Sequence, residues 1–248
     1  MARQHTRRAV IVNADDFGQS HGINRGIAHA YERGIVTSAS LMVRWDAAVA
    51  AAAYARAHAW LSVGLHVDLG EWSCRDGEWT MVYQRVDRTD PGAVEAEIRV
   101  QLAMCRELLG RDPSHLDSHQ HVHHEEPVRS ILGRIARELD VPVRHQSPGI
   151  RSEGRFYGQS NTGEVLHDHI SAACLIDLLR NLPEGVTELS CHPGYAQELA
   201  TMYRSEREME LRALCDAEVL HLLNDEEIAL ISFTDVAAVP LPRPGGLS

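Results

Sequence analysis

The sequence lacks any pairing pattern among its cysteines. Five cysteines occur in 248 residues, and no two of them are spaced as CxxC. They are Cys74, Cys105, Cys174, Cys191 and Cys215. A disulfide framework and a thiolate zinc site both need paired or closely spaced cysteines, so the pattern argues against both. A reducing compartment, the cytoplasm, suits such thiols best.

Long apolar runs are also missing. No segment approaches the roughly 20 apolar residues that a membrane-spanning helix needs. The apolar run Ala9–Val12 is too short for the core of a signal peptide and leads directly into Asn13. We therefore expect a cytoplasmic protein without a membrane span.

Positive charge is scarce. Lys and Arg together number 24 against 35 Asp and Glu, which gives a formal net charge of −11. Such a surface repels phosphates and anionic headgroups, so nucleic acid and anionic membranes are excluded as expected partners. A neutral ligand such as a small sugar is compatible with this charge. The oligomeric state stays open between a monomer and a homodimer.

Histidine is present in unusual number, with 15 residues. It is the commonest metal ligand and acid–base side chain, so its placement is informative. The hydrophobic fraction of 44% and the charged fraction of 24% are typical of a globular protein. The length suits one α/β barrel or one doubly wound sheet. We expect a single domain over residues 1–248, with a loose Pro/Gly-rich tail at 240–248.

Strand and helix signals alternate along the chain, which favours a mostly parallel sheet. The expected strands are Ala9–Asn13, Thr37–Val43, Leu61–Leu69, Ser114–Asp117, Pro142–His145, Thr187–Cys191 and Ala229–Phe233. The expected helices are Gly22–Arg33, Asp46–His58, Ala93–Leu109, Pro127–Leu139, Ile170–Leu182 and Arg204–Leu223. Two long stretches, Glu71–Pro91 and Pro148–Gly163, are expected to be loops that carry function.

Two adjacent carboxylates, Asp15 and Asp16, end the first expected strand. In parallel α/β folds ligands gather at the carboxyl ends of strands. Two neighbouring charges stay ionised there only with a cation or a shared proton, and a metal ion provides the former. A turn or helix-capping pair is the competing interpretation. Since adjacent strand residues point in opposite directions, the two can converge only where the strand has given way to a loop.

Histidines mark two further strand signals. His66 lies inside an apolar run, where a buried structural histidine is the competing interpretation, and Gly64 beside it permits a close approach. The segment His115–His124 holds five histidines and one aspartate. If extended, His119, His121 and His123 share a face, and if helical His119 and His123 do. A solvated histidine run is the alternative.

A fourth strand signal ends in His192, followed by Pro193 and Gly194. A histidine at the carboxyl edge of the sheet, beside a metal, is a candidate acid or orienting group. Together the four strand ends supply carboxylate and imidazole ligands. One carboxylate and two imidazoles would leave coordination positions open for water, which is typical of a catalytic metal site.

The sequence resembles the YdjC-like (ChbG/HpnK-type) carbohydrate deacetylases. The resemblance is carried by NADDFG (Asn13–Gly18), GIVTS (Gly34–Ser38), GLH (Gly64–His66), HLDSHQHVH (His115–His123) and CHPG (Cys191–Gly194), in the same order and spacing. It covers the chain from Val10 to about Leu214. It implies an α/β fold, a distorted (β/α) barrel of the glycoside hydrolase/deacetylase type. It also implies removal of an N-acetyl group from an amino sugar, a glycan or a glycolipid.

The resemblance also assigns site residues. It implies one divalent metal ion held by Asp16, His66 and His119, with Asp15 as general base and His192 as general acid. It points to Mg²⁺, whereas a site with one carboxylate and two imidazoles would also bind Zn²⁺. The segment Arg155–Gln159 resembles hopanoid-associated relatives, which leaves the choice between chitooligosaccharide and hopanoid-type glycolipid substrates open.

Two other classes of function compete with deacetylation. His119 and His121 form an HxH motif like that of amidohydrolases and metal-dependent phosphoesterases, which would bind two or three ions. A metal-binding or sugar-binding module would show no turnover. Asp117 is a candidate for orienting a ligand histidine. The roles of His121 and His123 stay open.

Overall fold

The computed structural model describes residues 8–75, 77–195 and 201–238. Its main sheet has seven strands in the order β6-β3-β2-β1-β8-β7, with β9 also paired to β1, and every pairing in it is parallel. The strands are β1 (Arg8–Phe17), β2 (Ser38–Leu41), β3 (Ser62–Val67), β6 (Leu116–Ser118), β7 (Ile150–Glu153), β8 (Gly185–Cys191) and β9 (Ala229–Ile231). The expected parallel α/β architecture is confirmed.

Strand β1 is the axis of the sheet. On one side it pairs along most of its length with β8, from Arg8 to Ala14. On the other side it pairs first with β9, from Ala9 to Ile11, and then with β2, from Asn13 onward. The carboxyl ends of parallel strands therefore meet at one edge, where a ligand site is expected.

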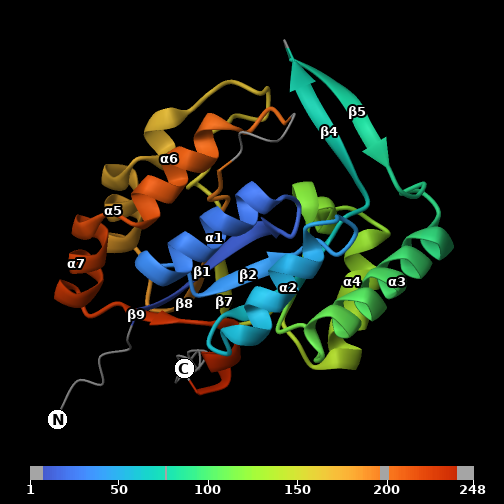
Figure 1. Cartoon of the computed structure of the whole chain (residues 1–248), viewed down its shortest axis with the longest axis horizontal. Helices are drawn as coiled ribbons and strands as arrows, with labels where there is room; N and C mark the ends of the chain where they lie inside the picture. The colour runs from blue at the N-terminus through green and yellow to red at the C-terminus, as the bar shows by residue number, and fades with distance from the viewer. Residues whose placement is uncertain (1–7, 76, 196–200, 239–248) are drawn as a thin grey trace, which may run out of the picture.

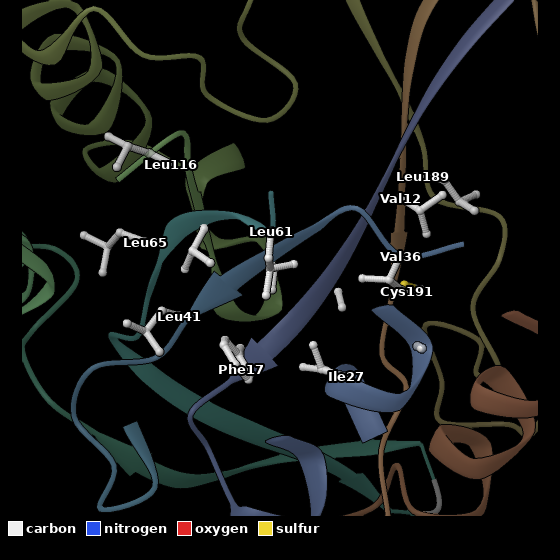
Figure 2. Packing of buried hydrophobic residues seen from close by; sticks show 14 of the residues in the cluster. Val12, Phe17, Ile27, Val36, Leu41, Leu61, Leu65, Leu116, Leu189 and Cys191 are labelled. Atoms are coloured by element: carbon white, nitrogen blue, oxygen red, sulfur yellow. The ribbon is translucent and has the colours of Figure 1, made fainter. Parts of the chain in front are cut away.

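The two faces of β1 carry different chemistry because side chains alternate along a strand. Val10, Val12 and Ala14 belong to a large apolar cluster shared with the helices, part of which Figure 2 shows around Ile27 of helix α1. Ala9 and Ile11 lie in a separate, smaller cluster with Val186 and Phe233. The row on that inner face continues with Asn13 and Asp15 toward the carboxyl edge, so the interior of the curled sheet becomes polar there.

Helices surround the sheet, with α1 and α2 over one part of it, α3 and α4 beside one edge, and α5 to α7 beside the other (Figure 1). Their bounds are α1 (His21–Arg33), α2 (Ala48–Ala57), α3 (Pro91–Leu109), α4 (Val128–Leu139), α5 (Ala172–Arg180), α6 (Ser205–Leu214) and α7 (Ala217–Asp225). Short 3₁₀ segments are η1 (His119–His124), η2 (His167–Ile170) and η3 (Phe233–Ala238). Within the described part of the chain, no helix has the length and apolar character to cross a membrane.

The prediction of one loop over Glu71–Pro91 is wrong. An antiparallel hairpin, β4 (Gly70–Arg75) and β5 (Glu78–Gln84), forms a second sheet there and projects away from the rest of the molecule (Figure 1). Nearly all of β5 is exposed, so the buried-and-exposed alternation that identifies a strand in sequence is absent from this strand.

Three other boundaries differ from the prediction. The single expected helix Arg204–Leu223 is two helices, because Asp216 accepts a hydrogen bond from the backbone N–H of Glu218 and begins α7. The expected strand Pro142–His145 is only one bridge, between Leu116 and Val143. The expected loop Pro148–Gly163 contains the edge strand β7. The expected loose tail at 240–248 lies outside the described residues.

Candidate active site

A cavity of about 610 Å³ lies at the carboxyl edge of the main sheet. All five site residues predicted from sequence line it, and they come from β1, β3, η1 and the end of β8: Asp15, Asp16, His66, His119 and His192. The structure therefore brings together residues that are up to 177 positions apart in sequence. Their catalytic and metal-binding roles stay predictions.

Asp15 and Asp16 both reach the cavity although they are adjacent in one strand. β1 continues to Phe17, so the expectation that the strand must first end in a loop is wrong. The pairing with β2 shifts between Ala14 and Phe17, and Asp16 has a left-handed backbone with φ 66°. This bulge breaks the alternation and turns Asp16 to the same side as Asp15.

Asp16, His66 and His119 form a compact buried group. Asp16 Oδ1 lies 3.3 Å from His66 Nε2 and 3.0 Å from His119 Nδ1. One candidate ligand atom from each residue lies within 4.8 Å of the others. Burial would raise the pKa of Asp16, but the Arg207 guanidinium, which donates to Oδ2 at 2.6 Å, and His119 hold it well below its usual value. Asp16 is therefore an anion at neutral pH.

His66 is oriented from behind by Asp117. The distance from His66 Nδ1 to Asp117 Oδ1 is 2.8 Å, which leaves Nε2 directed toward Asp16. A carboxylate on the far ring nitrogen is the usual partner of a metal-binding histidine. Despite burial, which lowers the pKa of His66, Asp117 and Asp15 raise it well above its usual value. The structure thus places Asp117 where the sequence suggested an orienting group.

Asp15 is fixed by one buried arginine. Arg144 Nη1 and Nη2 donate to its two carboxylate oxygens at 2.6 and 2.7 Å, and Asn13 adds a third hydrogen bond at 2.9 Å. The same guanidinium contacts Asp117 at 2.8 Å and donates to Glu188 at 2.6 Å. Burial would raise the pKa of Asp15, but Arg144 outweighs it and lowers that pKa.

His192 lies beside Asp15, the base predicted from the resemblance. Its Nε2 is 3.7 Å from Asp15 Oδ2, and its backbone N–H donates to Glu210. Burial lowers the pKa of His192 to about 4, so the ring is neutral at neutral pH and its reference value near ~6.5 does not hold here. Burial also raises the pKa of Glu210 to about 8.

Sequence reasoning missed four buried charged residues that hold this site. They are Arg144, Glu188, Arg207 and Glu210. Arg207 and Glu210 lie on α6 and bond to Tyr203, which precedes that helix, and their spacing of three and four residues was the available signal. Arg144 follows the isolated bridge at Val143, and no local pattern marks it as a partner of Asp15, which lies 129 residues earlier.

The histidine run does not present one face to one ion. Gln120 and His121 have left-handed backbones, with φ of 51° and 53°, so η1 is neither extended nor regularly helical. His119 joins Asp16, whereas His121 and His123 join His124 and His145 in a second group. The two geometries expected from sequence are therefore both wrong.

Aromatic side chains form part of the cavity wall. Trp72 and Trp79 reach it from the β4–β5 hairpin, and Tyr157 reaches it from the segment after β7. The Trp79 indole N–H donates a hydrogen bond of 3.2 Å to the backbone carbonyl of Asn161. This bond connects the hairpin to the segment after β7. Flat apolar rings beside polar groups suit the faces of sugar rings.

Comparisons with known proteins find relatives that match most of the chain. A family model described as YdjC-like protein matches residues 9–225. A carbohydrate deacetylase of Brevibacillus brevis is 31% identical over 254 residues, covering 92% of this chain and 99% of that protein. A chitooligosaccharide deacetylase of Klebsiella pneumoniae is 31% identical over 258 residues, again covering 92% of this chain and 99% of that protein.

Among the solved structures that match is one whose fold resembles most of the chain. It comes from Enterococcus faecalis V583, and its proposed role is cleavage of cellobiose phosphate. It superimposes with a TM-score of 0.72 at 23% identity and covers 93% of this chain and 99% of its own. At that identity the likeness concerns the fold, and it confirms the predicted distorted (β/α) barrel.

Proposed function

The chain belongs to the YdjC-like protein family, and from that premise we propose that it is a metal-dependent hydrolase that removes an N-acetyl group from an amino sugar. One observation carries the proposal: buried Asp16, His66 and His119 converge beside Asp15 and His192 in a single cavity. An arrangement of candidate ligands, base and acid in one cavity suits hydrolysis better than simple binding.

The three candidate ligands fit a divalent ion. Asp16 Oδ1 faces both imidazoles, and His119 Nε2 is buried without a hydrogen-bond partner among the described residues. A divalent ion held there would polarise the acetyl carbonyl and acidify the attacking water. Two imidazoles favour Zn²⁺ chemically, while the resemblance to the family points to Mg²⁺.

Asp15 is the proposed base. Its lowered pKa keeps it ionised and therefore able to accept a proton from water at neutral pH. Arg144 holds both carboxylate oxygens, so the carboxylate cannot rotate away from the cavity. The oxygen of that water forms the new bond to the acetyl carbon, and the C–N bond then breaks to give acetate and a free amine.

His192 is the proposed acid toward the leaving amine. Its ring is neutral before reaction, so the proton that it donates must arrive during turnover. The 3.7 Å separation of His192 Nε2 from Asp15 Oδ2 provides a short route for the proton taken from water. In this scheme one proton passes from water to Asp15, then to His192, and finally to the amine nitrogen.

The proposed substrate is a neutral N-acetylated sugar, with a chitooligosaccharide as the first candidate. Trp72 and Trp79 supply flat surfaces at the cavity wall, and the net charge of −11 suits a neutral ligand. A hopanoid-type glycolipid is the second candidate, because Arg155–Gln159 resembles that branch of the family and its Tyr157 and Gln159 line the cavity.

The HxH alternative has less support. It needs His119 and His121 to serve the same metal centre, as in amidohydrolases and phosphoesterases. Here His119 lies against Asp16, whereas His121 groups with other histidines. We therefore favour deacetylation over phosphoester hydrolysis.

A direct test is acetate release from N-acetylglucosamine and from chitooligosaccharides of several lengths, with protein loaded with Mg²⁺ or with Zn²⁺. Acetate and free amine are expected in equal amounts, and Asp15→Asn serves as the inactive control. If neither loaded form releases acetate, or if phosphate esters are the compounds hydrolysed, the proposed function is wrong.

A further inference from the structure

We propose that His121, His123, His124 and His145 form a second metal site, separate from the Asp16 group, that binds Zn²⁺ or a similar ion with a preference for imidazole. One candidate nitrogen from each ring lies within 4.8 Å of the others. The group contains four imidazoles and no carboxylate. Mg²⁺ and Ca²⁺ prefer oxygen ligands, so this donor set selects Zn²⁺, Cu²⁺ or Ni²⁺ instead.

The four rings already converge. The ring centroids of His124 and His145 are 4.5 Å apart, and those of His123 and His124 are 4.7 Å apart. His121 lies 5.7 to 6.0 Å from the other three centroids. A tetrahedral zinc ion with Zn–N bonds of about 2.0–2.1 Å needs nitrogens about 3.4 Å apart, so small ring rotations would complete the site.

His123 supplies an independent reason to expect a ligand. The residue is 1% exposed, and its Nε2 has no hydrogen-bond partner among the described residues. Its Nδ1 lies 2.7 Å from Ser118 Oγ, which also accepts the His123 backbone N–H at 3.0 Å. The ring is thus held in place from one side while a buried nitrogen remains unsatisfied on the other. A buried polar atom without a partner is costly, and coordination of an ion removes that cost.

The backbone presents these rings in an uncommon way. His121 and His145 both have left-handed backbones, with φ of 53° and 62°. Such conformations are uncommon for residues other than glycine and are concentrated at functional sites. They occur here in two separate segments, η1 and the turn after Val143.

The proposed ion would join these two segments. One of them begins with His119 of the Asp16 group, and the other carries Arg144, which holds Asp15. An ion at the histidine group would therefore cross-link the positions of a candidate ligand and of the arginine behind the candidate base. Its role would be structural, because four protein ligands would leave no position for substrate.

The test is metal stoichiometry in protein without a histidine tag. After loading with Zn²⁺ and dialysis, elemental analysis should find two ions per chain. The double variant H124A/H145A removes two exposed ligands and should retain one ion. The matched control H167A/H169A removes two exposed histidines of η2, outside both groups, and should retain two.

A second pair of measurements separates the two sites. Asp16→Ala should lose the ion of the Asp16 group and keep one ion, whereas Asp16→Ala combined with H124A/H145A should keep none. Zn²⁺ should raise the Tm of the Asp16→Ala variant, and this rise should vanish when His124 and His145 are replaced. A single ion in the parent that disappears in Asp16→Ala, or equal losses in H124A/H145A and H167A/H169A, would overturn the second site without affecting the proposed deacetylation.

Discussion

Asp15 and Asp16 are neighbours in sequence with different environments. Asp16 faces two imidazoles and Arg207, whereas Asp15 is held by Arg144 and Asn13. We therefore predict that Asp15→Asn retains its bound metal and loses turnover by roughly 10²–10⁴-fold, the usual effect of removing an acid–base group. Elemental analysis and acetate release measure the two quantities. Loss of metal together with activity would make Asp15 a ligand instead.

The proposed role of His192 as general acid can be tested by changing the leaving group of the substrate. His192→Gln should lower hydrolysis of an N-acetyl amide by roughly 10²–10⁴-fold, because an amine departs poorly without a proton. An activated acetate ester, whose leaving group needs no proton, should be affected far less. Equal losses on amide and ester would show that His192 positions the substrate.

Gly64 is constrained by a neighbouring side chain. A Cβ at this position would lie 2.5 Å from the ring of His115, which is fully buried. Gly64→Ala should therefore lower the free energy of unfolding by about 1–3 kcal/mol, as overpacking of a core does. The control is Gly154→Ala, since its added Cβ would meet nothing within 4 Å. Denaturant unfolding of both variants provides the comparison, and equal stability would contradict the packing argument.

Among the elements, the β4–β5 hairpin carries a testable part of the cavity wall. Trp79 lines the cavity, whereas Met81 lies two residues further along β5 and does not. Trp79→Ala should raise KM for a chitooligosaccharide several-fold with little change in kcat, because in the proposed function the ring would contact the sugar away from the reacting atoms. Met81→Ala, also an exposed position, should change neither constant. A matching rise in KM for both variants would contradict a role of the hairpin in substrate binding.

The elements that sequence predicted well are those with strong apolar patterns. β1 and β8 are buried strands in a parallel sheet, and α1 buries Ile23, Ile27 and Ala30 at helical spacing. The hairpin was missed because β5 is exposed on both faces. The break between α6 and α7 was missed because the helical apolar spacing continues across the Asp216 cap.

The same contrast applies to the site. Strand-end position sufficed to predict that Asp15, His66 and His192 meet, because parallel strands end at a common edge. The left-handed backbone of Asp16 could not be predicted, since it depends on how β1 pairs with β2. Arg144 could not be predicted either, because its carboxylate partners come from strands distant in sequence.

For the whole molecule, buried titrating groups set the pH dependence of stability. Glu188 and Glu210 have pKa values raised by burial to about 7 and about 8. Their folded pKa values exceed those of the unfolded chain, so the folded state binds more protons and stability falls as pH rises toward 8. Histidines with lowered pKa values, such as His115 at about 3, give the opposite slope only below about pH 6.5.

The metal-free protein should therefore lose stability between about pH 6.5 and pH 8, because Glu188 and Glu210 release bound protons there and the raised pKa values of His66 and His119 give a slope of the same sign. Glu210→Gln should reduce the slope of Tm against pH in that window, because one of the contributing groups no longer titrates. Thermal unfolding in the presence of a chelator measures this slope. An unchanged slope would assign the pH dependence to other groups.

The hairpin also has a consequence for how new specificities can arise. Its described residues pair with no strand of the main sheet, yet it delivers Trp72 and Trp79 to the cavity. The groups proposed for chemistry come from other elements, at strand ends and in η1. Under the proposed function, β4 is tied to the reactive groups, because Glu71 lies 4.0 Å from His119 Nε2 and the Gln120 side chain bonds the Trp72 backbone, whereas β5 carries Trp79 without such contacts among the described residues. Exchanging residues 78–84 between relatives is therefore the route to retarget recognition while the groups proposed for chemistry keep their neighbours.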